Sequence, residues 1–282
     1  MRRFATLMVE SQGAMTKITL NRPQRRNAFD GVMVAELGQA FETLEQDPAV
    51  RVVVLAAAGP VFCAGADIHW MQAESPVSEA RARDDAQQLT RTIRAVDECP
   101  CPVIARVQGP AFGGGLGLLA ACDMVVATED ATFVLSETKL GLVPAIIAPF
   151  LLRKAGESFL RRYGLSGETF DAATAGRFLL VHDIVPRHGL DVRIAELSAA
   201  ILRLAPRAVR DSKDLFRRMS SLSDHDCWSL GAEVNASARS GLEAAEGLSA
   251  FTDKRLPSWA QTSGRQPEEE AGTSDHGSLR HR

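Results

Sequence analysis

The hydrophobic pattern of the first half alternates between strand-length and helix-length segments. Residues 9–20 alternate apolar and polar side chains around a turn at Gly13, which predicts a β-hairpin that ends before Asn21. Residues 33–44 then carry apolar side chains at helical spacing. Residues 52–57 form an unbroken apolar run, which is typical of a parallel strand covered on both faces. This succession predicts a βαβ-like unit.

A similar order of elements follows in the same half of the chain. A small-residue loop at 59–67 precedes an amphipathic helix at 79–96 and an apolar strand at 102–107. Three glycines at 113–115 then open an apolar helix at 116–122. Ligands in open α/β sheets bind at the carboxyl ends of the strands. We therefore expect an α/β fold in which the two loops face each other across one site.

The second half of the chain is mostly helical, with a short strand predicted at 181–185. Helical spacing occurs at 142–155, 164–178, 190–204, from Pro206 onward, and at 228–251. Residues 261–282 are almost all polar, which predicts a disordered tail.

Composition narrows the class of protein. The chain has 282 residues, of which 45% are hydrophobic, enough to build a full core. A formal net charge of -3 without long blocks of like charge argues against nucleic-acid and membrane binding. The N-terminal stretch MRRFATLMVE has no sustained apolar run or small-residue cleavage site, and no segment reaches the run of about 18 apolar residues expected of a membrane span. We therefore predict a cytoplasmic protein.

The cysteines predict neither a disulfide framework nor a metal site. Their number is odd, and their spacing matches no zinc motif. They are Cys63, Cys99, Cys101, Cys122 and Cys227. We expect reduced packing residues, with Cys99-Pro100-Cys101 forming a helix-to-strand turn.

Two features carry candidate chemistry. The glycine run 113–115 leaves backbone N–H groups accessible at a helix N-terminus, where negative charge is favoured. Glu137 is the first carboxylate after the apolar strand 131–135, and a dry site would raise its pKa and suit it to proton transfer. The alternative is that Ser136 caps a short helix and Glu137 only stabilises its first turn.

Together, these motifs resemble the crotonase superfamily of enoyl-CoA hydratases and isomerases. The resemblance covers roughly residues 5 to 260. It rests on the segments ITLNRPQRRNAF, VFCAGADI, GPAFGGGLGLLAACDMVVA, FVLSETKLGLVP and GLSAFTDKRLPSW, in the family's order and spacing. It implies a spiral of ββα units at 1–195, a helical trimerisation region at 196–260 and the tail at 261–282. The implied assembly is a homotrimer or a dimer of trimers.

The resemblance also implies an active site. The family's oxyanion hole consists of two backbone N–H groups, which correspond to those of Ala66 and Gly114, and Glu137 corresponds to the acid/base. Such a donor stabilises an enolate transition state by about 3–4 kcal/mol. The substrate is an acyl-CoA thioester, and no metal or further cofactor is implied.

The implied CoA contacts come from the first half of the chain and from its C-terminal region. Residues 64–68 resemble the adenine-binding loop, in which Asp67 is also placed to cap the next helix. Lys254 has the alternative of being a solvated lysine at a helix end. The implied contact residues are Ala64, Gly65, Ala66, Asp67, Ile68, Gly113, Gly114, Phe251 and Lys254.

One departure from the family pattern affects the predicted reaction. Hydratases with two carboxylates carry an additional glutamate where this chain has Gly117. Isomerases of the superfamily keep only the later glutamate, and the dehalogenase branch needs an aspartate that 143–149 do not offer. His69, beside Trp70, is a candidate for the acyl or pantetheine channel, with packing or surface exposure as the alternative.

The hypothesis favoured by the sequence is an enoyl-CoA hydratase that uses Glu137. A Δ3,Δ2-enoyl-CoA isomerase and a non-catalytic acyl-CoA-binding homologue are the alternatives. The run SETKLGLVPAIIAPFLLRKAG, together with GADIHWM, is similar to methylglutaconyl-CoA hydratase-like proteins of leucine and acyclic terpene breakdown. This subgroup carries a P-A-x-I-x-P pattern after the later glutamate and implies a branched substrate.

Overall fold

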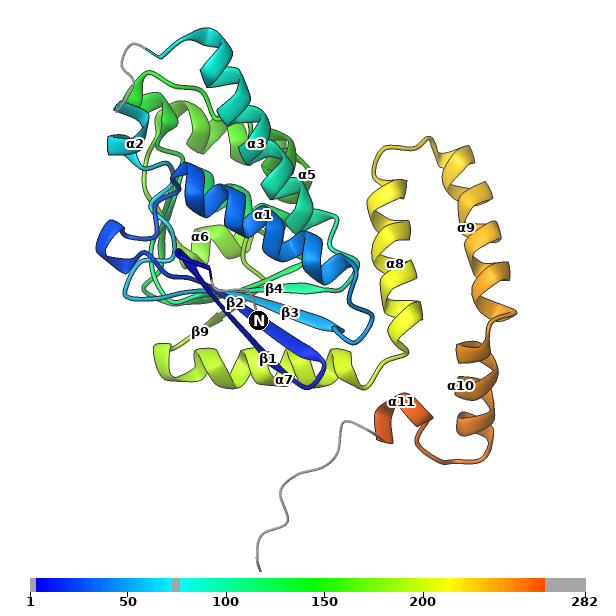
Figure 1. Ribbon diagram of the computed structural model, residues 1–282. Coiled ribbons are helices and arrows are strands. Elements are labelled where there is room, and N and C mark those ends of the chain that lie inside the picture. Colours follow the sequence, from blue (N-terminus) through cyan, green and yellow to red (C-terminus); the bar gives the residue numbers. More distant parts are fainter. Residues whose placement is uncertain (1–3, 73–76, 262–282) are drawn as a thin grey trace, which may run out of the picture.

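The computed structural model describes residues 4–72 and 77–261, and it is built on a six-stranded sheet (Figure 1). The strand order is β1-β2-β3-β4-β6-β9. The first pair is antiparallel and the remaining pairs are parallel. The strands are β1 (Leu7–Gln12), β2 (Met15–Leu20), β3 (Val52–Ala57), β4 (Val103–Val107), β6 (Met124–Thr128) and β9 (Asp183–Val185). Three short strands form a second sheet in the order β5-β7-β8, with bounds Ala111–Phe112, Thr132–Val134 and Phe170–Asp171.

The central strand β3 is buried along its whole length, as its unbroken apolar run predicts. Val53 and Leu55 belong to the main core cluster, which includes side chains of α1 (Gly31–Glu45) and α3 (Glu79–Asp97). Val52 and Val54 pack in a separate cluster with α7 (Leu190–Leu202). Helices therefore cover both faces of the sheet, which is why β3 shows no polar alternation (Figure 1).

The predicted elements of the first half are confirmed, and most of their ends lie within two residues of the predicted positions. The hairpin β1–β2 pairs Gln12 with Met15 across the turn. Helix α1 begins after Asp30, whose carboxylate accepts a hydrogen bond of 2.8 Å from the Met33 N–H. The apolar helix that follows the glycine run is α4 (Gly114–Ala121), in which every residue after Gly114 is buried. The remaining short elements of this half are η1 (Pro23–Arg25) and α2 (Ile68–Gln72).

Three helix predictions in the second half are corrected. The segment 142–155 is not helical before α5 (Ala148–Ser166), because the prolines at 144 and 149 favour the start of a helix over its interior. The segment 164–178 contains the end of α5, then β8, then α6 (Ala172–Arg177). Gly167, with φ +62°, ends α5, and Asp171 caps α6 through the Thr174 N–H.

The segment 228–251 is also divided. Helix α9 (Asp224–Arg239) and helix α10 (Leu242–Thr252) are separated at Ser240-Gly241. They follow α8 (Pro206–Met219) and extend away from the sheet, with α8 and α9 side by side (Figure 1). The other elements of this half are η2 (Glu137–Leu140), η3 (Arg187–Gly189) and α11 (Ser258–Gln261).

The sequence predicted one boundary between residues 195 and 196 and a second at the start of the tail. Helix α7 runs continuously across residues 195 and 196, so no break in the backbone marks that boundary. The predicted tail from 262 onward lies outside the described residues. Within the described parts of the chain, no helix is long and apolar enough to cross a bilayer.

Candidate active site

Two small-residue loops meet at the carboxyl ends of β3 and β4. They are bonded directly to each other, since the Phe62 N–H donates to the Pro110 carbonyl and the Phe112 N–H donates to the Cys63 carbonyl, both at 2.9 Å. Gly65 has φ +83°, and a Cβ added there would lie 3.0 Å from the Phe112 oxygen. Only glycine allows this approach, so the sequence expectation that the two loops face one site is confirmed.

Two backbone N–H groups remain unbonded where the loops meet. A Cβ on Gly65, the residue before Ala66, would lie 3.4 Å from the Gly114 nitrogen. The Gly113 N–H donates to the Val134 carbonyl at 2.8 Å. Among the described residues, neither the Ala66 N–H nor the Gly114 N–H has an acceptor. Gly114 is the first residue of α4, so its N–H has no partner inside the helix.

Glu137 lies beside the same glycine turn. Its Oε1 is 3.0 Å from the position that a Cβ on Gly113 would take. Its Oε2 is buried and has no hydrogen-bond partner among the described residues. Burial raises the pKa of Glu137 above its ordinary value, although the N–H groups of Glu137 and Ser136 oppose this shift. A carboxyl group in this state can exchange a proton with a bound molecule.

The alternative role of Ser136 as a cap is not supported by its contacts. Ser136 precedes the short helix η2, but its side chain makes no capping hydrogen bond. Its hydroxyl faces the same turn as Glu137, 3.2 Å from the position of a Cβ on Gly113.

Both free N–H groups and Glu137 line one cavity of about 850 Å³. Its volume suits an elongated organic ligand. Side chains of α2, α3 and the loop 140–147 form most of its wall, and most of them are apolar. They include Phe29, Val34, Trp70, Leu89, Leu142, Val143, Pro144, Ile146 and Ile147. The cavity can therefore hold an acyl chain with its thioester near the free N–H groups.

The predicted adenine-binding loop is only partly exposed to this cavity. Ala64, Gly65, Ala66 and Ile68 line it. Asp67 does not, because its carboxylate binds the Arg22 guanidinium at 3.1 Å and caps α2 through the His69 N–H at 3.0 Å. Burial acts to raise the pKa of Asp67, but these hydrogen bonds outweigh burial and lower it. Asp67 therefore holds the loop in place, as its predicted capping role requires.

Three further predicted residues lie outside the cavity of their own chain. His69 is exposed and does not line it, whereas its neighbour Trp70 does. Phe251 and Lys254 are at the end of α10, far from α2 and α3, and Phe251 is 86% exposed (Figure 1). A single chain does not bring these two residues to the cavity.

The position of the absent glutamate is filled by another side chain. Gly117 is buried in α4, and a Cβ there would lie 2.4 Å from Cγ2 of Ile147. No larger side chain fits at 117 without displacing Ile147, which itself lines the cavity. Sequence reasoning did not identify this contact. The P-A-x-I-x-P pattern could have indicated it, because the isoleucine of that pattern is Ile147.

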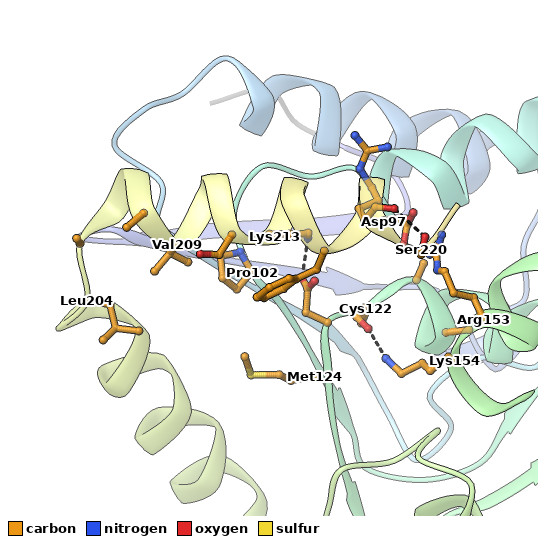
Figure 2. Close-up of a pocket in the computed structure, with 18 residues that line it drawn as sticks. Asp97, Pro102, Cys122, Met124, Arg153, Lys154, Leu204, Val209, Lys213 and Ser220 are labelled. Atoms are coloured by element: carbon orange, nitrogen blue, oxygen red, sulfur yellow. Dashed lines mark hydrogen bonds and ion pairs between the residues drawn. The ribbon is translucent and has the colours of Figure 1, made fainter. Parts of the chain in front are cut away.

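A second cavity, of about 780 Å³, lies at the opposite ends of the strands, between α8 and the starts of β4 and β6 (Figure 2). Asp123 binds Lys213 at 2.6 Å and accepts the Val103 N–H at 2.8 Å. Lys154 donates to the Cys122 carbonyl, and burial lowers the pKa of this lysine. Asp123 thus holds the start of β4 against α8.

Comparisons with known proteins agree with this geometry. The family model described as enoyl-CoA hydratase/isomerase matches residues 10–262. A hydroxycinnamoyl-CoA hydratase-lyase of Pseudomonas fluorescens is 33% identical over 227 residues, which cover 78% of this chain and 81% of that protein. A 2,3-dehydroadipyl-CoA hydratase of Escherichia coli is 32% identical over 262 residues, covering 90% and 98% respectively.

A solved structure of an enoyl-CoA hydratase from Shewanella pealeana matches with a TM-score of 0.87 and 36% identity, over 91% of this chain and 97% of that chain. A similar fold alone would not assign a family, but sequence identity and fold agree here over nearly the whole chain. The chain therefore belongs to the enoyl-CoA hydratase/isomerase family of enzymes and has the crotonase fold.

Proposed function

We propose that the protein is an enoyl-CoA hydratase, which adds water across the 2,3 double bond of an enoyl-CoA thioester. One observation carries this proposal: the carboxyl group of Glu137, whose buried Oε2 has no partner among the described residues, shares a cavity with the free N–H groups of Ala66 and Gly114. Burial that raises the pKa of Glu137 suits a group that must both accept and return a proton near neutral pH.

The proposed reaction assigns a role to each group. The thioester oxygen accepts hydrogen bonds from the Ala66 and Gly114 N–H groups, and the positive end of the α4 dipole adds to this stabilisation. A water proton passes to Glu137 while the water oxygen bonds to the β-carbon, and the π electrons move onto the thioester oxygen as an enolate. Glu137 then returns the proton to the α-carbon. The carboxyl group ends in its starting state, so no further cofactor is consumed.

The names of the relatives support hydration as the reaction class, since the two curated proteins compared above are described as hydratases of CoA thioesters. For this chain we propose a branched substrate such as 3-methylglutaconyl-CoA. The support is the similarity of 136–156 to methylglutaconyl-CoA hydratase-like proteins and the largely apolar wall of the cavity.

A specific observation favours a second candidate, a Δ3,Δ2-enoyl-CoA isomerase. Isomerisation needs one group that removes the α-proton and returns it two carbons away, and Glu137 is sufficient for that. The contact of Gly117 with Ile147 leaves no room for a second carboxylate in α4. Because two-carboxylate hydratases use a glutamate at position 117, a contact that excludes a larger side chain there favours isomerisation.

A spectrophotometric assay with three substrates separates the candidates. We expect turnover of crotonyl-CoA and faster turnover of 3-methylglutaconyl-CoA. Conversion of 3-hexenoyl-CoA alone would replace the hydratase by the isomerase. If wild type and Glu137→Gln bound CoA esters equally and neither converted any substrate, the protein would be a non-catalytic acyl-CoA-binding homologue.

We also propose that the chain acts as a homotrimer or a dimer of trimers, with α8–α11 between subunits. Large apolar side chains on these helices are exposed in the single chain, including Trp228 at 71% and Phe251 at 86%. Phe251 and Lys254 would then contact the CoA of a neighbouring subunit. Light scattering should report a multiple of three times the 30.4 kDa chain mass. A monomer of full activity would contradict this assembly.

A further inference from the structure

Hydration requires more of the site than proton transfer alone. An attacking water gives one proton to the base, but its orientation also depends on a second hydrogen-bond partner. The position of a second carboxylate in α4 is taken by Gly117 and Ile147, which offer no polar side chain. A different group must therefore hold the water next to Glu137.

The Ser136 hydroxyl lies near the Glu137 carboxyl group at the glycine turn. Its Oγ lies 3.2 Å, and the Glu137 Oε1 lies 3.0 Å, from the same point above Gly113. Both residues line the cavity, beside the free N–H of Gly114. Both oxygen atoms therefore lie against Gly113, one residue before the free N–H of Gly114.

The Ser136 hydroxyl is also unused by the fold. It makes no capping hydrogen bond to η2, and it has no other hydrogen-bond partner within the described residues. A hydroxyl both donates and accepts, so it can orient a water without adding charge to the site.

The charged side chains of the cavity wall make other contacts, and the neutral Gln88 lies on α3 rather than at the glycine turn. Arg81 and Asp85 bind each other at 3.1 Å on α3. The aliphatic stem of Lys139 packs against Gly167, with its Cε 3.0 Å from the position of a Cβ on that glycine. Ser136 thus remains as the neutral partner of Glu137.

We propose that Ser136 is a positioning residue that holds the attacking water for Glu137. The inference rests on the proposed hydratase function. The O–H bond of the water breaks toward Glu137 and its oxygen bonds to the β-carbon, while Ser136 keeps its own proton throughout. Its hydrogen bond only fixes the direction of attack.

The test compares hydration with a reaction of the same site that needs no attacking water. Exchange of the α-protons of butyryl-CoA in deuterium oxide requires Glu137 and the two N–H groups only. For Ser136→Ala we expect kcat for hydration of crotonyl-CoA to fall about tenfold, the rate equivalent of one neutral hydrogen bond. The exchange rate and KM should stay at the wild-type values, and Ser136→Thr should restore hydration.

Each outcome has a distinct meaning. Equal losses of hydration and exchange in Ser136→Ala would show that Ser136 only supports Glu137, and unchanged hydration would show that it has no role; either result overturns the inference and leaves the hydratase in place. A wild-type protein that exchanges α-protons but hydrates nothing would remove the proposed function, and this inference with it. Circular dichroism and CoA-ester binding check that both variants fold.

Discussion

The two cavities lie at opposite ends of the same parallel sheet and differ in how their charged groups are satisfied. At the amino ends of the strands, Asp123 is paired with Lys213, and Asp97 with Arg153. At the carboxyl ends, Glu137 has a buried oxygen without a partner, beside two N–H groups without acceptors. The two cavities have similar volumes, so size does not distinguish them.

This difference indicates that the charged groups of one cavity stabilise the fold, whereas those of the other are available to a bound molecule. A paired buried charge contributes to holding elements together, and its partners leave it little capacity to bind anything else. An unpaired buried carboxyl group costs folding free energy and is retained where a reaction uses it. The unpaired groups around Gly113 and Gly114, rather than the volume of the cavity, therefore distinguish the candidate active site.

The largest effect is expected from Glu137→Gln. Removing the carboxyl group that we propose transfers the proton should lower kcat for hydration by about 10²–10⁴-fold. The affinity for CoA esters, measured by calorimetry, should remain, because the N–H groups that bind the thioester are unchanged. Activity within about tenfold of wild type would show that another group transfers the proton and that the two cavities do not differ as described.

Gly117→Ala probes the packing behind the catalytic cavity. The added Cβ would lie 2.4 Å from Ile147 Cγ2, so we expect a loss of about 1–3 kcal/mol in the free energy of unfolding. Ile147→Ala in the same chain should restore part of that loss, giving a favourable coupling free energy.

Gly164→Ala is the matched control for Gly117→Ala. Gly164 is a helical glycine in α5 whose added Cβ would make ordinary contacts, at 3.6 Å and 3.7 Å. We expect no loss of stability there, and a gain of about 0.5–1 kcal/mol, because alanine favours the helix. Equal losses at both positions would contradict the close contact with Ile147.

Lys213→Met tests the paired cavity. Lys213 is bonded to Asp123 and to the Cys101 carbonyl, so its removal should lower the free energy of unfolding by about 1.5–3 kcal/mol. Hydration should be unchanged. Arg83→Gln, which breaks an exposed pair with Glu79, is the control and should cost at most about 0.5 kcal/mol. Loss of hydration by the folded Lys213→Met protein would contradict the separation of the two cavities.

The smallest effect is a pH dependence of stability. Because burial raises the folded-state pKa of Glu137, the neutral carboxyl group is favoured in the fold. The contribution of this group to the free energy of unfolding is fully present below the ordinary pKa of 4.5. It is lost as the pH rises through the raised pKa of the folded state. Glu137→Gln and wild type should therefore be equally stable in acid, with the variant becoming the more stable as the pH rises. Thermal unfolding across this range measures the difference, and a variant that is less stable at neutral pH would contradict it.

Much of the fold was predictable because its signals are local. The continuous apolar run of β3 predicted burial on both faces, and the alternation in 9–20 predicted the hairpin. The errors in the second half have local causes as well. Helical periodicity continues through 142–147 and 164–178, where prolines and a left-handed glycine at 167 interrupt the backbone.

The sequence by itself determined the family and the glycine loops and made Glu137 a candidate for proton transfer, because residue identities at motif spacing carry that information along the chain. Only the tertiary structure decided which groups lack partners: that Asp67 is bound to Arg22, that Ile147 fills the space beside Gly117, and that the Ser136 hydroxyl is free. The physical reason is that burial and hydrogen-bond satisfaction depend on residues brought together from distant parts of the chain, and no local pattern records which of them meet.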